Sequence, residues 1–98
     1  MMSNSDPRPL DEGEKRRKRL YFQCHHRGSK EADLLLGGFA RAHLAELSQA
    51  QLDRFEALLA NDDADIYGWL CGRLPVPQDH DDDVMVLLKS FVADRSRF

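Results

Sequence analysis

The near absence of β-branched residues is the feature that most limits what this chain can fold into. Among its 98 residues there is no threonine, one isoleucine and four valines. Strands are rich in β-branched and aromatic residues, and this chain has too few of them to form a sheet. The sequence therefore predicts an all-α protein of five short helices around one core. Its length is enough for a single small domain and too short for two cores.

The start of the chain is expected to differ from the rest. Residues 1–11 contain two prolines and are predicted to be a flexible N-terminal lead-in, so the five-helix domain is expected to span residues 12–98. The first helix is predicted over residues 12–25. The residues of this helix that we expect to face the core are Leu20, Tyr21 and Cys24.

A glycine and a serine separate the first helix from the second. Gly28 suits the left-handed backbone conformation that ends many helices, and Ser29 suits the cap of the next one. Gly37 and Gly38 lie inside the second helix, where each glycine costs about 1 kcal/mol relative to alanine. They predict either a kink or a close approach by a neighbouring helix, and the sequence leaves both open. The apolar face of this helix is expected to be Leu35, Leu36, Phe39 and Ala40.

The three remaining helices have clearer starts. Ser48 and Gln51 have the spacing of a capping box, which predicts the start of the third helix. The fourth is expected to begin near residues 61–62 and to end at Gly72, and the fifth to open on the acidic residues 79–83. The inward residues predicted for the fifth helix are Val84, Leu87, Leu88, Phe91 and Val92.

Composition favours a soluble protein with reduced thiols. No apolar run approaches the roughly 18 residues that would span a membrane, so no direct membrane insertion is expected. The first residues include acids and lack an apolar segment, which argues against a secretory signal or a transit peptide. Two cysteines are too few for a disulfide framework. A cytoplasmic location is the resulting expectation.

One basic run raises nucleic acid as an alternative partner. Residues 15–19 read KRRKR, whereas the chain as a whole carries a net charge of −3. The acidic remainder would repel phosphates, so a solvated helix face is favoured and no nucleic-acid partner is expected. The alternative function is a small helical nucleic-acid-binding regulator or antitoxin that uses residues 15–19.

The sequence offers weak candidates for metal or catalytic chemistry. Cys24, His25 and His26 are adjacent, but structural zinc sites show ligands paired at fixed spacings, and no such pair is present. Cys24 next to His25 is not a catalytic dyad, because the base must reach the thiol in space. We therefore expect no metal site, no catalytic residue and no enzyme. An enzyme built on Cys24 and His26 is the alternative, and a depressed thiol pKa would be its first sign.

The stretch from 24 to 33 combines the most polar chemistry with the least bulk. Its pattern Arg27-Gly28-x-x-Glu31 predicts a surface that docks onto another protein. Residues 26–33 (HRGSKEAD) resemble the R-G-x-x-E signature of the SdhE-type FAD assembly factors. Residues 58–70 (LLANDDADIYGWL) are similar to a second stretch of that family, L-L-x-x-D-D-x-D-Φ-x-x-W-L.

The resemblance implies a function for the whole chain. It implies a five-helix domain that binds the flavoprotein subunit of succinate dehydrogenase and promotes covalent attachment of FAD to a histidine of that client. Fumarate reductase is left open as a second client. The chain itself is expected to hold no cofactor stably and to be a monomer when free.

The resemblance also implies which residues touch the partner. Arg27, Gly28 and Glu31 are the implied contacts, with His26 and Asp33 flanking them. Arg27 offers a planar fork for a client carboxylate or for backbone carbonyls. Gly28 allows two backbones to meet, and Glu31 accepts hydrogen bonds from the client or orients Arg27. The structural alternative is an exposed Arg27–Glu31 pair worth about 0–1 kcal/mol, with Gly28 as a plain helix cap.

Overall fold

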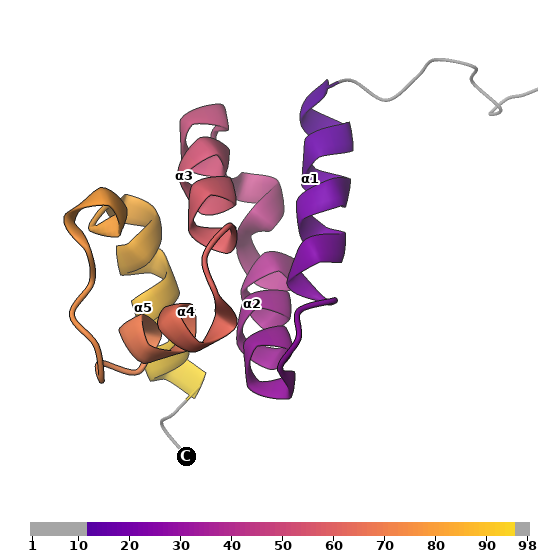
Figure 1. Ribbon diagram of the computed structural model, residues 1–98. Helices are drawn as coiled ribbons and strands as arrows, with labels where there is room; N and C mark the ends of the chain where they lie inside the picture. Colours follow the sequence, from indigo (N-terminus) through magenta and orange to yellow (C-terminus); the bar gives the residue numbers. More distant parts are fainter. Residues whose placement is uncertain (1–11, 96–98) are drawn as a thin grey trace, which may run out of the picture.

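The computed structural model describes residues 12–95, and within that range it contains five α-helices, two 3₁₀ turns and no strand (Figure 1). The all-α prediction is confirmed. The predicted lead-in 1–11 and the last residues of the predicted domain, 96–98, lie outside the described residues. No helix of the described part has the length and apolar character needed to cross a membrane. The elements are α1 (Glu12–Cys24), α2 (Lys30–His43), η1 (Leu44–Glu46), α3 (Gln49–Leu59), α4 (Asp63–Leu70), η2 (Gln78–His80) and α5 (Asp83–Arg95).

Helix α2 is the element against which most of the others pack. It contacts α1, α4 and α5, and α3 lies between α1 and α5 (Figure 1). Phe39 of α2 is fully buried, with its ring centroid 5.4 Å from that of Phe55 on α3 and 6.0 Å from that of Phe91 on α5. One aromatic cluster therefore joins three helices at the centre of the core.

The predicted inner face of α1 is correct at two of its three positions. Leu20 and Cys24 are fully buried, whereas Tyr21 is 40% exposed. Leu20 and Cys24 are four residues apart and share one helix face, but Tyr21 is rotated away from that face. Its ring packs instead beside the imidazole of His25, at 4.3 Å between centroids. The prediction for Tyr21 was therefore wrong.

The N-terminal caps predicted for α2 and α3 are present. Ser48 accepts a hydrogen bond from the backbone N–H of Gln51, and the side chain of Gln51 accepts one from the N–H of Ser48, which completes the capping box. Ser29 caps α2 by accepting from the N–H of Ala32 at 3.1 Å. After α4 the chain turns at Gly72, whose φ of 78° suits glycine.

The two glycines inside α2 permit close packing by side chains from other elements. Helix α2 runs without interruption through both. A Cβ on Gly37 would lie 2.8 Å from Nε2 of His25, and a Cβ on Gly38 would lie 3.1 Å from the ring of Phe91. Of the two explanations left open by the sequence, close approach is the one that the structure supports. The approaching groups are side chains rather than backbone.

Candidate partner-docking site

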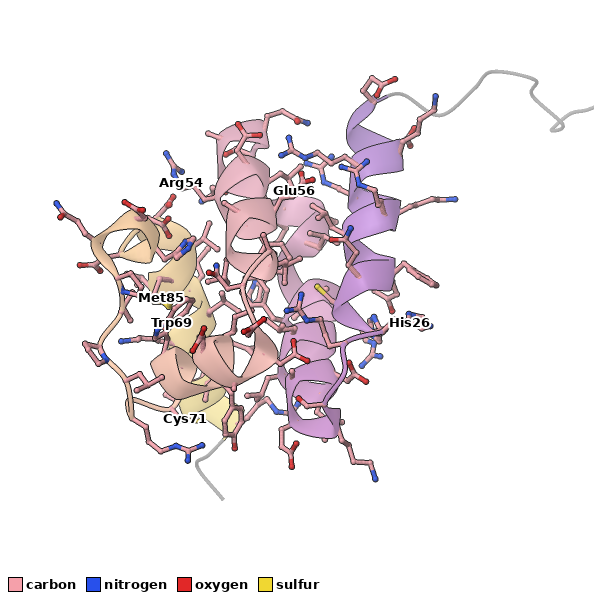
Figure 2. All side chains as sticks on the ribbon, in the orientation of Figure 1. His26, Arg54, Glu56, Trp69, Cys71 and Met85 are labelled. Carbon is pink, nitrogen blue, oxygen red and sulfur yellow. The ribbon has the colours of Figure 1, made fainter. Side chains whose placement is uncertain are left out.

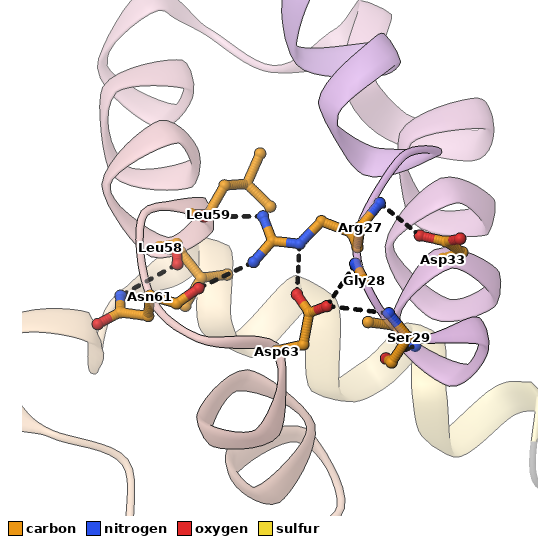
Figure 3. Close-up of polar contacts among 9 residues, drawn as sticks. Arg27, Gly28, Ser29, Asp33, Leu58, Leu59, Asn61 and Asp63 are labelled. Atoms are coloured by element: carbon orange, nitrogen blue, oxygen red, sulfur yellow. Dashed lines mark hydrogen bonds and ion pairs between the residues drawn. The ribbon is translucent and has the colours of Figure 1, made fainter.

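The turn between α1 and α2 meets the turn between α3 and α4, and one arginine joins them (Figure 3). We call residues 25–29 the Arg27 turn. Nη1 of Arg27 donates to the carbonyl of Leu59 at 2.7 Å, and Nη2 donates to the carbonyl of Asn61 at 2.8 Å. Its Nε donates to the carboxylate of Asp63. All three nitrogens of the guanidinium group therefore donate hydrogen bonds to other residues of the same chain.

Helix ends explain why this arginine lies here. The last carbonyls of a helix have no partner inside the helix and carry partial negative charge, so the end of α3 attracts a cation. Asp63 is the first residue of α4, where the partial charge is positive and a carboxylate is favoured. The side chains of Arg27 and Asp63 are only 11% and 19% exposed, so water screens their attraction weakly. This ion pair therefore stabilises the contact between the Arg27 turn and the start of α4.

Two carboxylates hold the backbone of the Arg27 turn. One oxygen of Asp63 accepts hydrogen bonds from the N–H of Gly28 at 2.9 Å and from that of Ser29 at 3.2 Å. Asp33, near the start of α2, accepts from the N–H of Arg27 at 2.7 Å. Three consecutive backbone donors therefore have charged acceptors, which are stronger partners than neutral ones. The turn is fixed by side chains from two different helices.

The five predicted contact residues separate into two groups. His26, Gly28 and Glu31 are exposed. Arg27 and Asp33 are partly buried, and their side chains form hydrogen bonds within the chain itself. The structural alternative of an Arg27–Glu31 pair is wrong, because Arg27 forms its ion pair with Asp63. Their role in binding a partner stays a prediction.

Gly28 does not have the left-handed conformation that its position predicts. Among the described glycines, only Gly72 has positive φ. The prediction was wrong because other groups close the end of α1. Nδ1 of His25 bonds the carbonyl of Tyr21 at 2.9 Å, and Nδ1 of His26 bonds that of Phe22 at 2.8 Å. A Cβ at Gly28 would be 3.7 Å from Asp63, an ordinary contact.

An open groove of about 590 Å³ lies beside the Arg27 turn. Its walls are the end of α1, the Arg27 turn and residues 59–63, and we call it the Arg27 groove. Phe22 lines it with a ring that is 60% exposed and is stacked on His26 at 3.8 Å between centroids. An exposed aromatic ring next to a fixed turn is a common feature of surfaces that bind proteins.

The cysteines do not form a catalytic site with the histidines. Cys24 is fully buried, and burial raises the pKa of its thiol to about 12, the opposite of the depressed value that an active nucleophile needs. Cys71 is exposed but lies far from His26 across the molecule (Figure 2). Within residues 12–95 no group of three or more His, Cys, Asp or Glu side chains is placed to hold a metal ion.

The two thiols are expected to differ sharply in reactivity. In the native chain a disulfide reagent should modify Cys71 and leave Cys24 intact until the protein unfolds, because a thiolate cannot form in the core. An unfolded cysteine has a pKa of about 8.5. The Cys24 thiol therefore stabilises the fold below about pH 8.5, and this contribution is lost as the pH rises towards 12.

The measurement is thiol titration of the wild type and of a Cys71→Ser variant, in buffer and in urea. The variant should react only in urea. Rapid labelling of the folded variant would show that Cys24 is accessible and that its pKa is not raised.

The basic run in α1 is largely occupied by contacts within the molecule. Arg16 forms ion pairs with Asp53 at 2.6 Å and with Glu56 at 2.9 Å, both on α3. Arg17 donates to the carbonyl of Leu47 at 2.6 Å. Arg19 also pairs with Glu56 at 3.3 Å and Lys15 with Glu12 at 3.8 Å, so four of the five basic side chains of the run have an acidic or carbonyl partner within the described chain. The nucleic-acid alternative is not supported.

Comparison with known proteins gives the family. Residues 18–92 match the Sdh5 family, described as the flavinator of succinate dehydrogenase. The chain belongs to this family. Succinate dehydrogenase assembly factor 2 of Dictyostelium discoideum, named as mitochondrial, is 38% identical over 82% of the chain. Assembly factor 2-A of Drosophila sechellia, also named as mitochondrial, is 38% identical over 92% of it.

A bacterial relative has a different name. The FAD assembly factor SdhE of Acetobacter pasteurianus is 41% identical over 65% of the chain. The chain spans little more than half the length of these relatives, with matches that cover 57%, 56% and 59% of them respectively. The resemblance found in the two sequence stretches is confirmed at the level of the family.

The expected cytoplasmic location needs correction. The Dictyostelium and Drosophila assembly factors are named as mitochondrial proteins, which contradicts that expectation. It rested on acidic residues near the start of the sequence and on the lack of an apolar segment there. Those residues do not decide the location, because the relatives contain further sequence outside the matched part.

The most important residue that sequence reasoning missed in this chain is Asp63. The helix dipole favours any acid in the first turn of α4, which accounts for Asp65 but not for the contacts of Asp63. A signal was present, since Asp63 belongs to the second stretch that resembles the family. Its partner in the first stretch, Arg27, lies 36 positions earlier, beyond the reach of local patterns.

Proposed function

We propose that this chain binds the flavoprotein subunit of succinate dehydrogenase through the Arg27 groove and the exposed side of the Arg27 turn, and that it thereby promotes flavinylation of that subunit. The client then attaches FAD covalently to its own histidine. Family membership and the names of the relatives support this function. The structural observation that carries it is the exposure of His26 and Gly28 on a turn fixed by two carboxylates, with the exposed Glu31 next to them in the first turn of α2.

The Arg27 groove suits a protein partner better than FAD itself. Arg27 is the arginine that lines it, and its guanidinium is already bound by Asp63 and two carbonyls. The exposed Asp62 on the same groove would repel the pyrophosphate of a dinucleotide. We therefore propose that the chain acts on FAD attachment without holding FAD and without a catalytic residue of its own.

A helper of this kind needs only to favour one conformer of its client. Holding a histidine against the flavin methyl carbon in a reactive geometry contributes about 7–11 kcal/mol in favourable cases. Moving a conformer from 1% to 99% of the population takes about 5.5 kcal/mol of differential affinity. An interface with a fixed turn and an exposed aromatic ring can supply that difference.

Substitutions on the exposed side of the turn test the proposal. Gly28→Arg should retain the helix content of the free chain and lower client flavinylation by roughly tenfold or more, because a long side chain would separate the two surfaces. Glu31→Ala should lower it less. The assay is covalent flavin on the purified client subunit, scored by fluorescence in a denaturing gel at limiting concentrations of the flavinator.

Matched controls use the same residue types on other exposed surfaces. Ser90→Arg places an arginine on α5, and Glu46→Ala removes an exposed glutamate of η1. Both should support normal flavinylation. If Gly28→Arg and Glu31→Ala also support it, the proposed docking surface is wrong. Light scattering of the free chain and of its mixture with the client checks the predicted monomer.

A further inference from the structure

The carboxylate of Asp63 binds three consecutive residues of the Arg27 turn from outside it, whereas that of Asp33 binds only the N–H of Arg27. Asp63 binds the side chain of Arg27 with one oxygen, and the backbone N–H groups of Gly28 and Ser29 with the other (Figure 3). These three donors belong to three consecutive residues. Asp63 comes from α4, 34 to 36 positions further along the chain.

The turn has no other strong restraint at its most exposed point. Gly28 has no side chain and no positive φ, and its N–H has Asp63 as its acceptor. Glycine has the widest choice of backbone conformations, so a glycine released from its acceptor regains many of them. Ser29 keeps its hydroxyl bond to Ala32 within α2, but its own N–H depends on Asp63. Loss of this carboxylate therefore loosens the residues on either side of the exposed corner.

We propose that Asp63 is a positioning residue for client binding, which acts by holding the Arg27 turn in its binding conformation. This inference rests on the proposed function. Asp63 itself is only 19% exposed, and its oxygens are occupied by donors of its own chain, so it acts through the turn. A surface that is fixed before binding loses less conformational entropy when the partner arrives.

The experiment compares Asp63→Ala with Asp65→Ala. Both remove an aspartate from the first turn of α4, but Asp65 is exposed and contributes no contact to the Arg27 turn. Flavinylation of the purified client subunit is measured over a range of flavinator concentrations, at a temperature where circular dichroism shows both variants to be folded. Asp63→Ala should raise the half-saturating concentration by about tenfold or more and leave the plateau unchanged. Asp65→Ala should match the wild type.

Hydrogen exchange of the free chain supplies a readout that a general loss of stability would not reproduce. In Asp63→Ala the amides of Gly28 and Ser29 should exchange faster, while amides in the middle of α2 and α3 keep their protection. Asp63→Asn is the second variant, in case alanine prevents folding. It keeps the shape and one acceptor oxygen, but in either orientation its NH2 group would face a donor, either Nε of Arg27 or the N–H groups of Gly28 and Ser29, so a loss of affinity in the same direction is expected.

The outcomes separate this inference from the function on which it rests. If Gly28→Arg abolishes flavinylation while the folded Asp63 variants saturate like the wild type, the positioning role is overturned and the docking surface stands. If neither substitution has an effect, both proposals fail. Faster amide exchange at Gly28 and Ser29 together with a higher half-saturating concentration supports the positioning role.

Discussion

Replacing Arg27 by alanine is expected to lower the free energy of unfolding by about 3 kcal/mol and to abolish client flavinylation at limiting concentrations. The substitution leaves the carbonyls of Leu59 and Asn61 and the carboxylate of Asp63 without their cation. Breaking a mostly buried ion pair from one side is costly because the remaining charge keeps its desolvation penalty. Urea unfolding followed by circular dichroism measures the loss of stability.

Two further arginine variants make this prediction specific. Arg27→Lys keeps the charge but cannot present three planar donors, so we expect a substantial part of the stability to be lost. Arg54→Ala removes an arginine from an exposed pair with Asp83, both of them about half exposed, and should cost about 0–1 kcal/mol. Equal effects of Arg27→Ala and Arg54→Ala would contradict a structural role for Arg27.

Replacing Phe39 by alanine is expected to destabilise the protein by about 3–5 kcal/mol. Its ring is fully buried and contacts rings on α3 and α5, so the cavity would open where three helices meet. Small domains are stable by only about 5–15 kcal/mol, and the variant should therefore unfold at a much lower urea concentration.

A phenylalanine on the surface provides the control. Phe22→Ala removes a ring that is 60% exposed, and its effect on stability should stay within about 0.5 kcal/mol. Phe39→Leu keeps much of the volume and should fall between the two. An unfolding midpoint of Phe39→Ala close to that of the wild type would show that the core does not centre on this ring.

Local chemistry made much of the fold predictable. The capping box of Ser48 and Gln51 and the cap by Ser29 depend on residues three positions apart, so the sequence displays them directly. The inward face of α1 was less certain, because helical spacing alone does not show how wide the buried face is. Tyr21 lies just beyond its edge.

The candidate site was predictable only in outline. The pattern around Arg27 and Gly28 indicated the correct turn, but its charge partner could not be identified from neighbouring residues. Glu31 is close in sequence and was the natural candidate, whereas the actual partner is Asp63. Tertiary packing decides in favour of Asp63 over Glu31, because the carbonyls at the end of α3 hold the Arg27 guanidinium next to the start of α4. Burial of Cys24, by contrast, was predicted from helical spacing, and it raises the pKa of the thiol instead of lowering it as an active nucleophile needs.

The span of the Arg27–Asp63 pair has a consequence for the order of folding. The two residues are 36 positions apart, and closing a loop of that length is entropically unfavourable, whereas each helix can begin to form from nearby contacts. We therefore expect the pair to close after α1, α2 and α3 have assembled. A partly unfolded chain would then lack the fixed Arg27 turn, and under the proposed function we expect such a chain not to compete with the folded one for the client subunit.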